Sequence, residues 1–528
     1  MKHFTITFKP DDKKISIHAG ATLLEAAGQA GIILNTICGG KGICEKCLVN
    51  LEPDSQQVLA CQYHIQSDLT VTIPAGSRFF EQKILAEGID TKDKIQPDIY
   101  KKYLQGDSAA PIFGVAVDIG TTTVVARLID MTDGRSLATV AELNPQSRYG
   151  DDVISRITYA ETDAKLTELH ETIINCVNEL IARLCKQAGA DAESIYEVAV
   201  VGNTTMNHIF LKLPVKQLGL APYKAFCLDA QDTPADDMVL QINRAGNIHT
   251  ASNIAGFVGS DTTAVALAVD IDSAEEMTLA VDIGTNGELV LGTGDKLYAA
   301  SCAAGPALEG ARIACGSRAA EGAIEAVVAG EDDIVLDVIG NCPARSICGS
   351  GLIDAVAVLL ELGIIDASGR FVNASTLADS VPVSIASRIR IEIGEPVFIL
   401  TDSTDAETVF LTQKDIRQVQ LAKAAIRTGI KLLQKKVGII DADIQQIFLA
   451  GAFGNYIRRE SALRIGLLPD VPTERIHFVG NAASAGAQMI LLSRHCREKA
   501  QELARKIEYI EIAHEKEFQD VFADSMNF

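Results

Sequence analysis

FGVAVDIGTTTVVARLID at residues 113–130 and TLAVDIGTNGELVLG at residues 278–292 are two copies of one pattern, and this pattern decides the fold. Each copy is an apolar run, then Asp-Ile-Gly-Thr, then a second apolar run, which predicts a buried strand, a tight turn and a returning strand. The repeat indicates an internal duplication. Strands and helices alternate after Pro111, so we predict an α/β architecture for this part of the chain.

The two turns carry residues that suit a phosphate. Glycine lets backbone N–H groups come close to phosphate oxygens, and threonine hydroxyls add donors. An aspartate at the end of a strand can hold Mg²⁺, usually through the water molecules of the ion. Two such turns facing each other would grip the β- and γ-phosphates from both sides. The phosphate and Mg²⁺ candidates are Asp118, Gly120, Thr121, Thr122, Asp282, Gly284, Thr285 and Asn286.

Two later segments complete this set. QQIFLAGAFGNYI (445–457) predicts a strand that runs into a glycine-rich loop, where a nucleoside could lie against exposed backbone. IHFVGNAASAGAQMILL (476–492) predicts a strand followed by a helix whose small residues permit close helix packing. The nucleoside-side candidates are Gly451, Gly454, Gly480 and Asn481. Glu288 and Glu309 are candidates to orient an attacking water, although each could equally be a salt-bridged surface carboxylate.

A cluster of cysteines near the start of the chain predicts a metal centre. The spacing is Cys38-x5-Cys44-x2-Cys47, and Cys61 follows on a separate segment. Thiolates at such spacing can wrap one inorganic cluster, and the glycines 39, 40 and 42 allow the loop to approach it closely. Structural zinc is the alternative. The hairpin expected at residues 3–18, with Pro10-Asp11-Asp12 in the turn, the short helix after Thr22 and the four cysteines together resemble the β-grasp [2Fe–2S] ferredoxin.

Composition excludes several functions. The net charge of −22 makes nucleic acid an unsuitable partner. No apolar run is long enough for a membrane helix, and the start MKHFTITFKPDDKK lacks the apolar core of a signal peptide. We expect a cytoplasmic protein without a membrane partner, in which Cys342 and Cys348 are buried free thiols rather than half of a second cluster.

The two DIGT turns, the GAFG loop and the Gly-Asn turn, in this order, resemble the phosphate, adenosine and connecting motifs of the actin-like ATPase superfamily. The resemblance implies two ribonuclease-H-like lobes with ATP between them. The alternative is an α/β protein that binds no nucleotide. The expected domains are a ferredoxin-type domain at 1–76, a linker at 77–110 that forms a tether with one short helix, ATPase lobe I at 111–274, and lobe II with C-terminal helices at 275–528.

Further segments, among them NPQSRYGDDVISRI (144–157), VVGNTTMNHIF (200–210), GFVGSD (256–261) and TQKDIRQVQLAKAAI (412–426), resemble the reductive activators of corrinoid proteins over the whole chain. The resemblance implies ATP-dependent delivery of one electron from a [2Fe–2S] cluster to Co(II), which restores Co(I) for methyl transfer. Some members carry an extra middle domain, for which this chain has no room.

The partners implied are a corrinoid protein of a methyltransferase system and an upstream low-potential electron donor, with a homodimer left open. The loop residues Gln146, Arg148, Asp152 and Asn203 are candidates to face the corrinoid partner, although plain turn chemistry is the alternative. In the helix expected at 413–437, Ile416, Val419, Leu421 and Ile426 are expected in the core. Alternative functions are an activator of a dehydratase or reductase, a small-molecule kinase with a regulatory cluster, and an actin-like scaffold that only binds nucleotide.

Overall fold

The computed structural model describes residues 3–9, 13–30, 34, 47–53, 56–74, 95–104, 111–150, 152–330, 332–373, 377, 381–392, 394–401, 408–451 and 457–528. The hairpin turn at 10–12, the glycines 39, 40 and 42, Cys38, Cys44 and Gly454 lie outside these residues.

The N-terminal domain is a five-stranded sheet with the order β2-β1-β5-β3-β4. The expected hairpin is present, because β1 (His3–Lys9) pairs antiparallel with β2 (Lys13–His18). The expected helix, α1 (Leu23–Gln29), begins at a capping box in which the amide of Glu25 donates to Oγ1 of Thr22 (3.1 Å) and the amide of Thr22 donates to Oε2 of Glu25 (2.7 Å). β5 (Leu69–Thr72) runs parallel to β1, while β3 (Leu48–Leu51) and β4 (Gln56–Leu59) complete the sheet. This is the predicted β-grasp arrangement.

The first DIGT turn belongs to a six-stranded sheet with the order β10-β11-β9-β6-β7-β8. β6 (Phe113–Ile119), β7 (Thr123–Asp130) and β8 (Ser136–Leu143) form an antiparallel meander, and β9 (Ile195–Gly202) and β11 (Asn247–Thr250) continue the sheet parallel to β6. β10 (Gln231–Pro234) closes the far edge. The long helix α4 (Asp163–Ala188) packs on β7 and β8. Shorter helices are α3 (Val153–Tyr159), α5 (Thr204–Phe210) and α6 (Ala235–Met238).

The second DIGT turn belongs to a sheet of the same design, with the order β22-β21-β12-β13-β14-β23. β12 (Thr278–Ile283), β13 (Gly287–Thr293) and β14 (Lys296–Cys302) form the meander, and β21 (Gln446–Ala450) and β22 (Ile476–Gly480) run parallel to β12. β23 (Glu508–Tyr509) covers the other edge. The shared order confirms the predicted duplication and the two-lobed fold.

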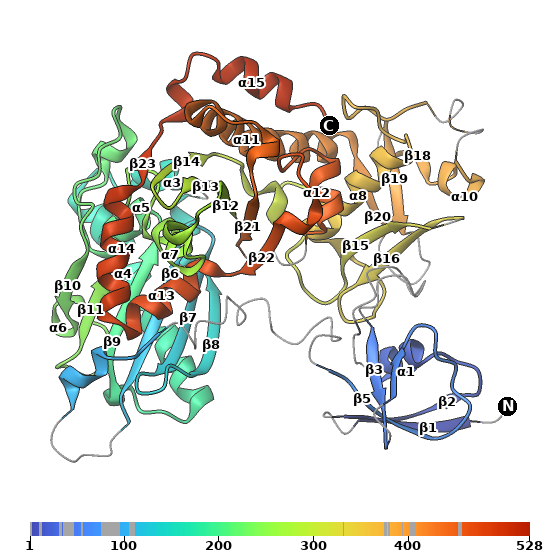
Figure 1. The fold of residues 1–528 in the computed structure, drawn as a ribbon, viewed down its shortest axis with the longest axis horizontal. Helices are drawn as coiled ribbons and strands as arrows, with labels where there is room; N and C mark the ends of the chain where they lie inside the picture. Colours follow the sequence, from blue (N-terminus) through green and yellow to red (C-terminus); the bar gives the residue numbers. More distant parts are fainter. Residues whose placement is uncertain are drawn as a thin grey trace.

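Two helices cross between the lobes. α7 (Ser260–Ala268) leads from the first sheet to the second, and α13 (Ala482–Leu492) follows β22 but packs against α7, β6 and β9 (Figure 1). A Cβ atom on Gly486 of α13 would lie 2.1 Å from the carbonyl oxygen of Ala264 in α7. The small residues therefore allow the close packing that the sequence predicts. α14 (Arg494–Lys506) continues along α7.

The remaining elements extend lobe II. β15 (Ala323–Ala329), β16 (Ile334–Val338) and β17 (Ser346–Ile347) form one small sheet, and β18 (Ile389–Glu392), β19 (Glu395–Thr401) and β20 (Val409–Thr412) form another. The helices of this region are α8 (Gly349–Glu361), α10 (Val383–Ala386), α11 (Gln413–Val437), α12 (Arg459–Arg464) and α15 (Phe518–Ser525).

Helix α11 has the bounds that the sequence predicts. Ile416, Val419 and Ile426 are fully buried, as expected. The expectation for Leu421 is wrong, because 39% of this residue is exposed. It lies two residues after Val419, which places it about 200° away around the helix axis, on the outer face. Cys348 is a buried free thiol as expected, whereas Cys342 is only half-buried.

Part of the expected linker is firmly packed. Residues 99–103 form the short helix η3 (Ile99–Tyr103), and Ile99 is buried at the junction of the lobes. Oδ1 of Asp98 accepts from the amide of Arg494 at the start of α14 (2.9 Å). Residues 75–94 and 105–110 lie outside the described residues. Among the described helices, none combines the length and the apolar character needed to cross a membrane.

Candidate active site

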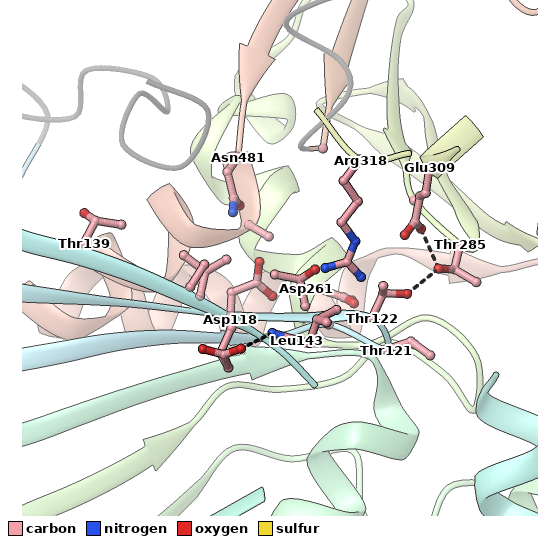
Figure 2. Close-up of a pocket in the computed structure, with 18 of the residues that line it drawn as sticks. Asp118, Thr121, Thr122, Thr139, Leu143, Asp261, Thr285, Glu309, Arg318 and Asn481 are labelled. Atoms are coloured by element: carbon pink, nitrogen blue, oxygen red, sulfur yellow. Dashed lines mark hydrogen bonds between the residues drawn. The ribbon is translucent and has the colours of Figure 1, made fainter. Parts of the chain in front are cut away.

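The two DIGT turns face each other across one cleft of about 1230 Å³ (Figure 2). Each turn is a tight hairpin, closed by a bond from the amide of Gly120 to the carbonyl of Thr123 (3.0 Å) in lobe I and from Gly284 to Asn286 (3.0 Å) in lobe II. All eight predicted phosphate and Mg²⁺ candidates line this cleft, together with Glu288, Glu309, Gly451 and Asn481. The structure therefore brings together residues that are far apart in the sequence.

A chain of hydroxyl contacts joins the lobes at the centre of the cleft. Oγ1 of Thr285 donates to Oε1 of Glu309 (2.6 Å), and Oγ1 of Thr122 lies 2.9 Å from Oγ1 of Thr285. Either hydroxyl can be the donor in the second contact. Burial raises the pKa of Glu309, which favours a carboxyl that can exchange protons within the cleft. Three groups that can bind or orient a phosphate or a water thus meet at one point.

Four carboxyl groups surround the floor of the cleft. Burial, together with the charges of Asp261 and Asp282, raises the pKa of Asp118 to about 8. Burial and Asp261 raise the pKa of Asp282 to about 7, and burial raises that of Asp261 to about 6. The pKa of Glu288 is well above its usual value for the same reasons. Buried like charges oppose each other's ionisation, so this donor set favours a divalent cation such as Mg²⁺ with oxygen ligands.

A buried polar frame holds the first DIGT turn from behind. Nδ2 of Asn144 donates to the carbonyl of Gly120 (2.8 Å), and Nη2 of the fully buried Arg156 donates to the carbonyl of Thr121 (2.6 Å). Nδ2 of Asn203 donates to Oγ1 of Thr121 (3.0 Å). Segments 144–157 and 200–210 therefore fix the orientation of the turn.

Gln146 and Asn203 do not face a partner as expected, because both are buried, while the expectation for the exposed Arg148 and Asp152 stays a prediction. Gln146 is buried, and its Nε2 donates to the carbonyl of Leu169 (3.0 Å). Asn203 is also buried and caps α5. Asp152 caps α3, and Nη2 of Arg148 donates to Oγ1 of Thr172 (3.2 Å). Turn and cap chemistry, the simpler interpretation, accounts for these contacts.

The nucleoside-side candidates lie at the ends of β21 and β22. Gly451 lines the cleft with a φ of +99°, and a Cβ atom there would lie 2.5 Å from the carbonyl oxygen of Ile283. Its amide donates to the carbonyl of Gly480 (3.0 Å), which does not itself line the cleft. Asn481 caps α13 and lies beside Asp118, whose pKa it lowers. Gly451 and Asn481 thus border the phosphate turns, while Gly454 is outside the described residues.

Sequence reasoning missed two charged residues of the cleft. Asp261 begins α7 in the GFVGSD segment, which carried a family resemblance but no assigned role. Arg318 follows Glu309 in a loop of lobe II and points into the cleft from the side opposite Asp118 (Figure 2). The strand-to-helix junction between β11 and α7, near the end of lobe I, could have indicated Asp261. Arg318 lies in segment 304–324, which also carried the family resemblance but in which only Glu309 was assigned a role.

Two of the four predicted cluster cysteines are described. Cys47 and Cys61 are buried at one end of the N-terminal sheet, and their Sγ atoms lie 3.3 Å apart. This separation is far longer than a disulfide bond, so the two sulfurs are not joined as a disulfide. Cys38 and Cys44 lie outside the described residues. A pair of adjacent buried thiols fits one side of an iron–sulfur cluster.

Comparison with known proteins identifies the family. Residues 4–75 match the profile of a 2Fe-2S iron-sulfur cluster binding domain, residues 113–274 match the RACo middle region, and residues 276–528 match the C-terminal domain of RACo, the ASKHA domain. The chain is 36% identical over 580 residues to "Corrinoid activation enzyme RamQ" of Eubacterium limosum, which covers 97% of each chain. The chain belongs to the family of reductive activators of corrinoid proteins.

Two further comparisons agree with this family. A reductase from Methanosarcina barkeri, named for a Co(II) methylated amine-specific corrinoid protein, is 26% identical over 79% of this chain and 77% of its own. A solved structure of a "Reductive activator for corrinoid,iron-sulfur protein" superposes with a TM-score of 0.75 at 31% identity, over 99% of this chain and 98% of that chain.

The family match settles several open alternatives. The protein is an ATP-dependent reductive activator of corrinoid proteins with a [2Fe–2S] domain and an ASKHA ATPase domain. The zinc, dehydratase-activator, kinase and scaffold alternatives are therefore set aside. The middle-region profile matches residues 113–274, the segment that we predicted to be lobe I. This region shares the strand order of lobe II, so the fold gives no separate inserted domain there.

Proposed function

We propose that this protein returns the Co(II) form of a corrinoid protein in a methyltransferase system to Co(I), in the cytoplasm. An upstream low-potential donor reloads the cluster, which supplies the single electron when it is bound by Cys38, Cys44, Cys47 and Cys61. The name of the M. barkeri relative supports a partner that serves methylated amines, since that protein is described as acting on such a corrinoid protein.

The proposed role of ATP rests on the contact between Thr122 and Thr285. It spans the two lobes at 2.9 Å, in a place lined on both sides by phosphate-binding turns. A triphosphate held by both turns would take over the hydrogen bonds that these hydroxyls now make with each other. Binding and release of ATP would then change the position of one lobe relative to the other. This motion can do work on a docked partner.

The residues of the cleft have different proposed roles in the binding and hydrolysis of ATP. Asp118 and Asp282 hold Mg²⁺ with the triphosphate, and the charge of the ion offsets the carboxylates that surround it. Gly120, Thr121, Gly284, Thr285 and Asn286 supply donors to the phosphates, while Glu288 or Glu309 orients the water. The nucleotide base lies toward Gly451, Gly454 and Gly480.

ATP drives the electron transfer through the state of the partner, since hydrolysis cannot push an electron directly. Each ~1.4 kcal/mol of coupling shifts a one-electron potential by about 59 mV. Lobe closure against the corrinoid protein that weakens an axial cobalt ligand would raise the potential of the acceptor. The energy of ATP thereby makes an unfavourable reduction possible.

An anaerobic assay tests the proposal. The reduced protein is mixed with a Co(II) corrinoid protein from the same genome, with and without Mg-ATP, and the cobalt spectrum is followed. We expect Co(I) to form only with ATP. Formation of Co(I) at an equal rate and extent without nucleotide would contradict the proposed coupling, and failure with every methyltransferase corrinoid protein of that genome would contradict the partner.

A further inference from the structure

Arg318 is a cationic side chain that enters the cleft. It lies in lobe II, on the loop that joins Glu309 to β15, and its guanidinium group points toward the side of the cleft that carries Thr122 and Asp261 (Figure 2). Among the described residues, no hydrogen bond or ion pair holds this group. Its charge nevertheless lowers the pKa of Glu309, so the two side chains share one part of the cleft.

The loop that carries Arg318 is anchored in the residues just before it. The amide of Ser317 donates to the carbonyl of Ile347 (2.9 Å), and the amide of Ile347 donates to the carbonyl of Cys315 (2.9 Å). Oγ of Ser317 lies 2.6 Å from Oγ of Ser346. Gly310 has a φ of +77°, and a Cβ atom there would lie 2.1 Å from the carbonyl oxygen of Ser317. The backbone next to Arg318 is therefore fixed, although no hydrogen bond or ion pair among the described residues holds its guanidinium group.

The acidic side chains that line the cleft favour a cationic side chain at the position of Arg318. Five carboxyl groups line its inner part: Asp118, Asp261, Asp282, Glu288 and Glu309. The described lining contains two cationic side chains, Arg183 and Arg318. Nη1 of Arg183 is paired with Oε2 of Glu142 at 2.7 Å, at the end of the cleft formed by α4 and β8. Arg318 is thus the cationic side chain of the described lining that remains available to a bound triphosphate.

We propose that Arg318 is a catalytic residue of ATP hydrolysis, which binds the terminal phosphoryl group in the transition state. Water forms a bond to the γ-phosphorus while the bond from this phosphorus to the β–γ bridging oxygen breaks. ADP leaves with the electron pair, and the proton of the water is released to the solvent. A guanidinium group can donate two parallel hydrogen bonds to the phosphoryl oxygens, where charge builds up as this group is transferred. The inference rests on the proposed use of the cleft for ATP.

The test measures ATP hydrolysis and ATP binding without any corrinoid protein. We expect R318Q to lower kcat by about 100-fold or more, as removal of one charge-stabilising donor does elsewhere, while the dissociation constant for a non-hydrolysable ATP analogue changes far less. R318K keeps the charge but loses the planar pair of donors, so its kcat should lie between those of R318Q and the unchanged protein. Arg183→Gln is the matched control, since it removes an arginine from the same cleft but from a paired position, and its kcat should stay unchanged.

Rescue with free guanidinium separates catalysis from folding. Millimolar guanidinium chloride should restore part of the kcat of Arg318→Ala and none of that of D282N, which loses a proposed Mg²⁺ ligand. The inference would be overturned if R318Q hydrolysed ATP with a kcat within a few-fold of that of the unchanged protein. It would also be overturned if R318Q and R183Q lost the same share of kcat, or if R318Q lost only affinity for ATP. If D282N also hydrolyses ATP normally, the proposed cleft itself is wrong, so the two failures are distinguishable.

Discussion

Glu325 is the most unusual carboxyl group outside the cleft. Only 2% of the residue is exposed, and neither carboxylate oxygen has a hydrogen-bond partner among the described residues. It lies at a bulge between β15 and β16, where Asp337 is its charged neighbour. Burial, and then the charge of Asp337, raises its pKa to about 9. A carboxyl group whose pKa is raised by folding makes the free energy of unfolding depend on pH.

We predict that this stability is lost as the pH rises. Because the pKa is higher in the folded state, the folded protein binds more protons than the unfolded chain between about pH 4.5 and pH 9. The contribution is complete below pH 4.5 and falls by at most about 1.4 kcal/mol for each pH unit within this window. E325Q should therefore have a shallower decline of Tm from pH 5 to pH 9, measured by thermal denaturation. Exposed Glu321 on the preceding loop supplies the control E321Q, and equal slopes for E325Q and the unchanged protein would contradict the prediction.

Helices α7 and α13 cross between the two lobes, so their close packing helps to set the position of one lobe relative to the other. Gly486 sits where the two helices touch, and any side chain there meets the backbone of Ala264. We predict that G486A lowers stability by about 1–3 kcal/mol, as overpacking of a close contact does, and lowers the rate of ATP hydrolysis as well. Scanning calorimetry and an ATPase assay measure the two effects. Glu498→Ala, on the exposed face of α14, is the control. A G486A protein with unchanged Tm would show that the helices separate freely at this point.

A second element, the segment 95–104, is held by a buried charge. Glu197 is fully buried and accepts from Tyr103, from Nζ of Lys102 (2.8 Å), from Nη2 of Arg497 (2.7 Å) and from Nδ2 of Asn247 (2.7 Å). Burial alone would raise its pKa, but Arg497 and Lys102 hold it below the usual value. The end of the linker, the edge of lobe I and α14 thus meet at one carboxylate.

We predict that E197Q destabilises this junction strongly. Breaking one side of a buried ion pair costs about 3–5 kcal/mol, because the remaining charges stay buried. The Tm should fall, and proteolysis within residues 95–104 should become faster. E193Q, which removes an exposed carboxylate at the start of the same strand, should change neither. Cleavage at the same rate in E197Q and E193Q would mean that other contacts hold the segment.

Sequence patterns predicted individual helices and hairpins of this protein but not the contacts between distant segments. Local patterns predicted α11, α13 and both DIGT hairpins because periodicity, caps and glycine turns are encoded in neighbouring residues. They did not predict that residues 95–104 pack against Glu197 and Arg497, since this contact joins segments that are far apart in the sequence. For the same reason the sequence placed Asp118, Asp282 and Glu309 in one site through a repeat and a resemblance, but assigned no role to Arg318. Polarity alone also misplaced Gln146 and Asn203, whose side chains serve a buried frame.

At the scale of the whole molecule, electron delivery and ATP hydrolysis reside in separate parts of the chain. The cluster ligands that are described, Cys47 and Cys61, belong to the core of the N-terminal sheet. The described residues that line the cleft all follow position 117. Because effects at distant sites without shared partners act independently, the two activities should be separable by substitution, while their product, the reduction of Co(II), should need both.

We predict that C61S loses the visible absorption of the cluster and all formation of Co(I), yet hydrolyses ATP within about twofold of the unchanged protein. D282N should show the reverse pattern, with an intact cluster spectrum, little ATP hydrolysis and no Co(I). Half-exposed Cys227 lies in lobe I and provides the control C227S, which should keep both activities. Co(I) formed in a mixture of C61S and D282N would mean that one copy can supply the electron while another uses ATP. Co(I) formed by D282N alone would show instead that the cluster reduces the partner without work from the cleft.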